Sequence, residues 1–188
     1  NRNTEPLRFV LDTGSGITVI SEDTAERLKI KEINKGGYAK GIGGDGKFEI
    51  VYGYLQSISI GDVKVRDVPV YIRKFHNDQI HVDGYIGLAV ISKFLATIDY
   101  GSRTFSLLKK DDPRAQNENS SISLPLRLTS SGFLSGQVLI EGIDSSLNFI
   151  VDTGASVSVI SNSVASAEAI LPFANDEKLR VIGSAGLT

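Results

Sequence analysis

The sequence predicts a mainly β protein that contains two copies of one structural unit. Three observations point to this fold class: a repeated apolar segment that ends in Asp-Thr-Gly, stretches that alternate apolar and polar residues, and turn residues between those stretches. The length of 188 residues suffices for one large or two small domains, and the apolar fraction of 41% is typical of a globular chain. We therefore expect a packed core.

The repeat emerges when the sequence is moved along itself by 140 positions. The segment FVLDTGSGITVIS at residues 9–21 then lies over FIVDTGASVSVIS at residues 149–161. The register holds without a net insertion as far as Gly46 and Gly186, so two copies of one unit explain it better than chance. We predict a first unit at residues 1–110, a polar linker at 111–132, and the first half of a second unit at 133–188.

The first unit has recognisable elements in order. An apolar strand leads to Asp12, and a short helix is expected to start at Ser21 or Asp23. Residues 54–72 alternate apolar and polar side chains around a turn at Gly61-Asp62, as in antiparallel strands. Residues 84–108 predict a strand, a short helix around Ile91 to Phe94, and a closing hairpin that turns at Gly101-Ser102.

The second unit opens with an element that the first one lacks. Residues 135–154 predict a strand, a turn at Gly142 to Ser146, and the strand that carries Asp152. The first unit contains only the second of these strands, so we expect it to lack its first strand. The second copy reaches just past Gly186, so we expect it to be incomplete in this chain.

Composition excludes several classes of function. The net charge of −2, with acidic and basic residues interleaved, offers no basic face for nucleic acid. No apolar run is long enough to span a membrane. The absence of cysteine removes a thiolate nucleophile and a cysteine zinc site, but it fits both reducing and oxidising compartments. The compartment stays open, with an extracytoplasmic one favoured.

The two Asp-Thr-Gly segments carry the chemistry. One such tripeptide is usually just a turn, but two at equivalent places in a repeat can meet across a pseudo-twofold axis. Asp12 and Asp152 would then be two carboxylates side by side, which cannot both ionise easily and so share a proton. One can take a proton from a bound water while the other protonates the carbonyl that the water attacks, with no metal and no cofactor.

These segments, together with GIGGDG at 41–46 and DGYIGLAVISKFLATIDYGSRTFSL at 83–107, resemble the retropepsin-like aspartic proteases. The resemblance is to the bacterial branch in which two such units can follow one another in one chain. It implies two closed β-barrel units of the acid protease fold, related by a pseudo-twofold axis, each with one or two short helices. It also implies an aspartic endopeptidase, active on polypeptides, whose two units form a pseudo-dimer.

The resemblance also assigns roles to residues. Asp12 and Asp152 would be catalytic, Thr13 and Thr153 would brace the two turns, and Gly14 and Gly154 would complete them. The residues expected in a substrate-covering flap are Ile42, Gly43 and Gly44, with Ile182, Gly183 and Ser184 as their counterparts. The copies differ at Ser15 and Ala155, where a hydroxyl could bond the carboxylate and lower its pKa.

Two further segments of the sequence resemble known binding motifs. GIGGDG matches the dinucleotide fingerprint, but no strand precedes it and no helix opens after it. His76, Asp78, His81 and Asp83 could suggest a metal site, but a polar loop is the simpler interpretation. Two alternatives stay open: a peptide-binding module without catalysis, and a protease whose units pair between chains as a homodimer. The cleavage specificity cannot be predicted from the sequence.

Overall fold

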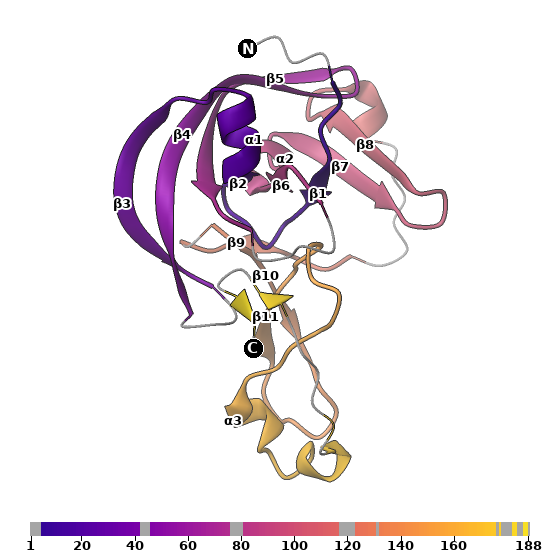
Figure 1. Ribbon diagram of the computed structural model, residues 1–188. Helices are drawn as coiled ribbons and strands as arrows, with labels where there is room; N and C mark the ends of the chain where they lie inside the picture. The colour runs from indigo at the N-terminus through magenta and orange to yellow at the C-terminus, as the bar shows by residue number, and fades with distance from the viewer. Residues whose placement is uncertain are drawn as a thin grey trace.

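The computed structural model describes residues 5–41, 46–75, 81–116, 123–130, 132–175, 177, 182–183 and 186–187. It confirms a mainly β protein, with short helices between the strands (Figure 1). In the described part of the chain, no helix has the length and apolar character needed to cross a membrane. The closure of each unit into a barrel and the domain bounds stay predictions.

A six-stranded mixed sheet forms the body of the first unit (Figure 1). The strand order is β1-β6-β2-β5-β4-β3. The bounds are β1 (Phe9–Leu11), β2 (Thr18–Ser21), β3 (Glu32–Lys40), β4 (Lys47–Ile60), β5 (Val63–Arg73) and β6 (Gly84–Ile86). β1 runs parallel to β6 and β2 runs parallel to β5, while the other pairs are antiparallel.

Two hairpins turn at the residues that the sequence predicts. β4 and β5 pair up to Ile60 and Val63, so the predicted turn at Gly61-Asp62 is confirmed. Gly61 has a φ of 54°, a left-handed conformation that glycine adopts without steric cost. β7 (Phe94–Asp99) and β8 (Thr104–Lys109) form the closing hairpin, and the predicted turn at Gly101-Ser102 lies between them.

The first unit contains two short helices. α1 (Glu22–Arg27) begins after Ser21, whose hydroxyl accepts a hydrogen bond from Thr24 N, so the predicted helix start is confirmed. α2 spans Leu88–Ile91, so the prediction of a helix around Ile91 to Phe94 was wrong. Gly87 caps α2 three residues earlier than expected, and Phe94 instead begins β7, where it pairs with Lys109 of β8.

The core lies between one face of the large sheet and the two helices (Figure 1). Its most buried members are β-branched residues of central strands, with Ile20, Val68 and Val70 each 1% exposed and Val90 of α2 fully buried. Full burial of such a side chain contributes about 1.5–3 kcal/mol. Packing of this core therefore fixes the strands that lie next to the first Asp-Thr-Gly turn.

The second unit is a smaller assembly below the first in Figure 1. Its three-stranded sheet has the order β11-β10-β9, all antiparallel. The bounds are β9 (Arg127–Leu128), β10 (Leu134–Val138), β11 (Leu147–Ile150), α3 (Asn162–Ala165), β12 (Ile182–Gly183) and β13 (Gly186–Leu187), with 3₁₀ turns η1 (Pro113–Gln116) and η2 (Leu171–Phe173). β9 lies inside residues 111–132, which the sequence predicts to be a linker.

The repeat is visible in matching caps. Ser161 caps α3 as Ser21 caps α1, with its hydroxyl accepting a hydrogen bond from Val164 N. The strand before the cap differs, however, because Val159 is 59% exposed whereas Val19 is 8% exposed. In the first unit β5 and β6 flank this stretch, whereas among the described residues no strand pairs with residues 158–161.

Candidate active site

The sheet delivers Asp12 directly from the end of β1. Asp12 N donates to Ile86 O at 3.0 Å, so the backbone of the aspartate still belongs to the ladder with β6. The next turn is held from the other side by α2, where Leu88 N donates to Ser15 O at 2.8 Å. A side chain at Gly87 would place its Cβ 2.6 Å from Ile17 O, so only glycine allows this close approach.

The second aspartate arrives in the same way from β11. Val151 N donates to Leu134 O at 2.9 Å, and Asp152 follows at once. Asp152 is exposed, whereas Asp12 is half-buried. The two units therefore present equivalent carboxylates in unequal surroundings.

Thr13 and Thr153 lock the two turns together. The Thr13 hydroxyl donates to Val151 O at 2.6 Å, and the Thr153 hydroxyl donates to Leu11 O at 2.7 Å. Each hydroxyl also accepts from the backbone N–H of the other threonine, at 3.1 and 3.2 Å. The four bonds are related by the 140-residue repeat, so they form a pseudo-twofold symmetric clamp between residues far apart in sequence.

The two glycines allow the carboxylates to meet. Gly14 N donates to Asp12 Oδ1 at 2.9 Å, and Gly154 N donates to Asp152 Oδ1 at 2.8 Å. A Cβ on Gly14 would lie 2.4 Å from Cγ of Asp152, and one on Gly154 would lie 2.9 Å from Oδ1 of Asp12. Each carboxylate therefore sits over the glycine of the opposite turn.

The environment raises the pKa of Asp12 to about 7. Burial is the largest cause, followed by the negative charge of Asp152 and a hydrogen bond between the two carboxyl groups. The Gly14 N–H and the positive charge of Arg73 act in the opposite direction. At mildly acidic pH, the pair of carboxyl groups therefore holds a proton more readily than an isolated aspartate would.

Ser15 does not act as the sequence suggested. Its hydroxyl donates to Ile17 O at 2.7 Å, which uses the only proton that the side chain could give to a carboxylate. The expectation that this hydroxyl could bond the carboxylate of Asp12 is therefore wrong. The difference in burial, not the change from Ser15 to Ala155, distinguishes the two aspartates.

The predicted flap residues are only partly within the described residues. Ile42, Gly43, Gly44 and Ser184 lie outside them. Of the described residues on either side of residues 42–44 in the sequence, Gly41 N donates to Gly46 O at 3.0 Å. Ile182 and Gly183 form β12, which pairs with β13 in a second, shorter hairpin. Their contact with a substrate stays a prediction.

Sequence reasoning missed the surroundings of three residues of the first unit. Asp83 was taken for part of a polar loop, but it is 6% exposed and accepts hydrogen bonds from Arg8 N, Thr24 Oγ1 and Arg27. Burial raises the pKa of Asp83, but these three partners together hold it below the usual range. The other two are Arg73 and Tyr85, each of which feels the charge of Asp12.

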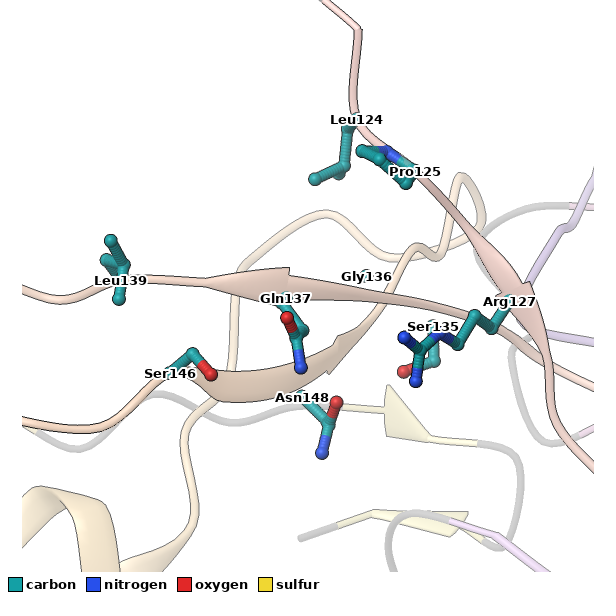
Figure 2. Close-up of a pocket in the computed structure, with 9 residues that line it drawn as sticks. All are labelled: Leu124, Pro125, Arg127, Ser135, Gly136, Gln137, Leu139, Ser146 and Asn148. Atoms are coloured by element: carbon teal, nitrogen blue, oxygen red, sulfur yellow. The ribbon is translucent and has the colours of Figure 1, made fainter.

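A separate hollow of about 370 Å³ lies on the sheet of the second unit (Figure 2). It is lined by Leu124, Pro125, Arg127, Ser135, Gly136, Gln137, Leu139, Ser146 and Asn148. Neither aspartate reaches it. Among the described residues no cluster of three His, Cys, Asp or Glu could hold a metal ion. The expectation of catalysis without a cofactor stays a prediction.

One family model matches residues of the first unit. Residues 2–90 match the family described as aspartyl protease, and this stretch includes β1 to β6, Asp12 and the residues predicted to form the first flap. The match ends before the second Asp-Thr-Gly, so the tandem arrangement stays a prediction. No curated protein matches the chain. Residues 2–90 are therefore similar to the aspartyl protease family.

Proposed function

We propose that the protein is an aspartic endopeptidase in which Asp12 and Asp152 form one catalytic pair. The observation that carries the proposal is the meeting of the two carboxyl groups over the clamp of Thr13 and Thr153. A structural turn would need neither carboxylate to face its twin. Two ionised carboxylates close together in a half-buried site would cost free energy, because burial and their like charges both disfavour ionisation. The two groups therefore share one proton, which an acid–base mechanism requires.

The proposed reaction follows the general acid–base logic of such a pair. The raised pKa of Asp12 favours a pair that holds one proton, so that one carboxyl group is protonated and the other is ionised. The carboxylate takes a proton from a bound water as the water oxygen attacks the peptide carbonyl carbon. The protonated member gives its proton to the carbonyl oxygen, so that a tetrahedral diol forms. The C–N bond then breaks as the carboxyl group that took the water's proton passes it to the leaving amine nitrogen, and a diol hydroxyl returns a proton to the other carboxylate, which restores the pair.

The clamp supports a site formed within one chain. All four of its hydrogen bonds join residues 11–13 to residues 151–153 of the same polypeptide. A covalent link between the units raises their effective concentration, so pairing within the chain competes well against pairing between chains. We therefore propose that the two units act in cis on a polypeptide substrate.

The test is cleavage of an unfolded, dye-quenched protein across a pH series. Asp12→Asn and Asp152→Asn should each abolish cleavage, because an amide can neither accept the proton of water nor hold the shared one. Asp62→Asn, at the exposed turn between β4 and β5, is the matched control and should cleave normally. Activity should survive EDTA and should be highest at acidic pH.

Several outcomes would contradict the proposal. If units paired between chains, each single variant would keep one type of intact site and thus partial activity. A binding module without catalysis would cleave nothing in any variant. It would also bind a peptide with a hydroxyl in place of the scissile carbonyl no more tightly than the natural peptide, whereas a protease prefers the transition-state mimic.

A further inference from the structure

The joined ends of β3 and β4 reach beyond the rest of the large sheet (Figure 1). β5 pairs with β4 only as far as Ile72, which lies opposite Val51. Past that point, residues 47–49 of β4 pair with residues 38–40 of β3, and among the described residues no strand pairs with them on the side of β5. We call these two stretches the arm. Its attachment to the rest of the unit therefore depends on side chains.

β4 and β5 separate at the base of the arm. Directly opposite residues of two strands share a face of the sheet, and the rings of Tyr52 and Tyr71 meet edge-on there, with centroids 5.2 Å apart. The same register would place Phe48 opposite Phe75, but β5 ends at Arg73. A cavity of about 160 Å³, lined by residues of both strands, lies beside the resulting gap.

The guanidinium group of Arg73 bridges this gap. Its Cζ atom lies 4.5 Å from the ring centroid of Phe48 and 5.6 Å from that of Phe75. A planar cation near the face of an aromatic ring is attracted by the ring. Phe75 in turn packs edge-on against Tyr85 of β6, with ring centroids 5.0 Å apart. A chain of contacts therefore leads from the arm through Arg73 to a central strand.

Few other side chains of the arm reach the rest of the unit. Tyr38 is 77% exposed, and Lys47 and Glu49 are also exposed. Phe48 is half-buried, as is Arg73. Among the large side chains of the arm that the structure describes, Phe48 thus makes the main contact with the strands beyond β4.

We propose that Arg73 anchors the arm: by contacting Phe48 and Phe75 at once, it fixes the arm relative to β5 and β6. The arm leads into residues 42–44, the predicted flap, which lie outside the described residues. In the proposed protease Arg73 is thus a positioning residue, which acts on substrate binding through the arm. This consequence rests on the proposed function, whereas the anchoring itself does not.

The experiment is amide hydrogen exchange of the full chain, followed by mass spectrometry. Arg73→Gln removes the planar cation, so the amides of the arm should exchange about two- to thirty-fold faster, the range expected from the loss of one cation–π contact. Phe48→Leu removes the ring and keeps an apolar side chain, and it should have the same local effect. The double variant should exchange no faster than the faster single variant, because both changes break the same contact.

The matched control is Arg66→Gln, which removes the same group from an exposed position on β5. It should leave exchange in the arm unchanged. The hairpin of β7 and β8 is the internal reference, and its exchange should be the same in all variants. Less than a twofold change in the arm of folded Arg73→Gln would overturn the proposal. So would an equal acceleration in the β7–β8 hairpin, or effects of the two substitutions that multiply in the double variant.

The cleavage assay tests the consequence for the proposed reaction. Arg73→Gln should raise KM for an unfolded protein substrate and change kcat less, because the arm acts on binding and not on proton transfer. A wild-type KM in this variant would refute the role in substrate binding. Faster exchange in the arm of a protein that cleaves nothing would refute the proposed function and leave the anchor standing. Normal cleavage with unchanged exchange would do the reverse.

Discussion

Replacing Thr13 by valine should lower the free energy of unfolding by about 2–6 kcal/mol. Valine keeps the shape of threonine but removes a hydroxyl that donates to Val151 O at 2.6 Å and accepts from Thr153 N at 3.1 Å. Thr13 is 8% exposed, so little water can replace the lost partner. Each buried group left without a partner costs about 1–3 kcal/mol, and two such groups give the stated range.

The assay is urea unfolding followed by circular dichroism. Thr13→Ser keeps the hydroxyl and should recover most of the loss. Thr104→Val is the matched control, because the hydroxyl of Thr104 bonds only another exposed hydroxyl, that of Ser102, and its removal should cost less than about 0.5 kcal/mol. A loss below about 0.5 kcal/mol for Thr13→Val would refute the view that the clamp holds the two units together.

Two further predictions concern the buried carboxylates. Asp83→Asn should destabilise the protein by about 2–4 kcal/mol at pH 7, because it leaves Arg27 and Arg8 N without their acceptor charge, while Asp62→Asn should have little effect. The pKa of Asp83 is held low, so its contribution should fade as pH drops below about 4. Asp12 behaves in the opposite sense: its pKa is raised to about 7, so the folded state binds its proton more tightly than the unfolded state does. Between pH 7.5 and pH 4.5 the wild type should therefore gain roughly 2–4 kcal/mol of unfolding free energy relative to Asp12→Asn, and equal slopes for both proteins would contradict this.

Several features were determined by the sequence alone because they depend on local patterns. The alternation at residues 54–72 requires strands, and Gly61-Asp62 requires a turn there. Ser21 before an acidic first turn predicts the start of α1. The helix near Ile91 was misplaced because a short apolar run fits a helix or a strand equally well, and only the pairing of Phe94 with Lys109 decides between them.

The pairing of the two aspartates was predicted through the repeat, because equivalent segments of two units can meet across an axis. In the structure, Thr13 and Thr153, which are 140 positions apart, exchange hydrogen bonds and hold the two turns side by side. The role of Ser15, the burial of Asp83 and the place of Arg73 could not be predicted. Each depends on which atoms lie nearby after folding: Ile17 O for Ser15, Thr24 for Asp83, and two aromatic rings for Arg73. Local patterns thus specify the strands and turns that carry the carboxyl groups, whereas their protonation depends on burial and neighbouring charges, which exist only in the tertiary structure.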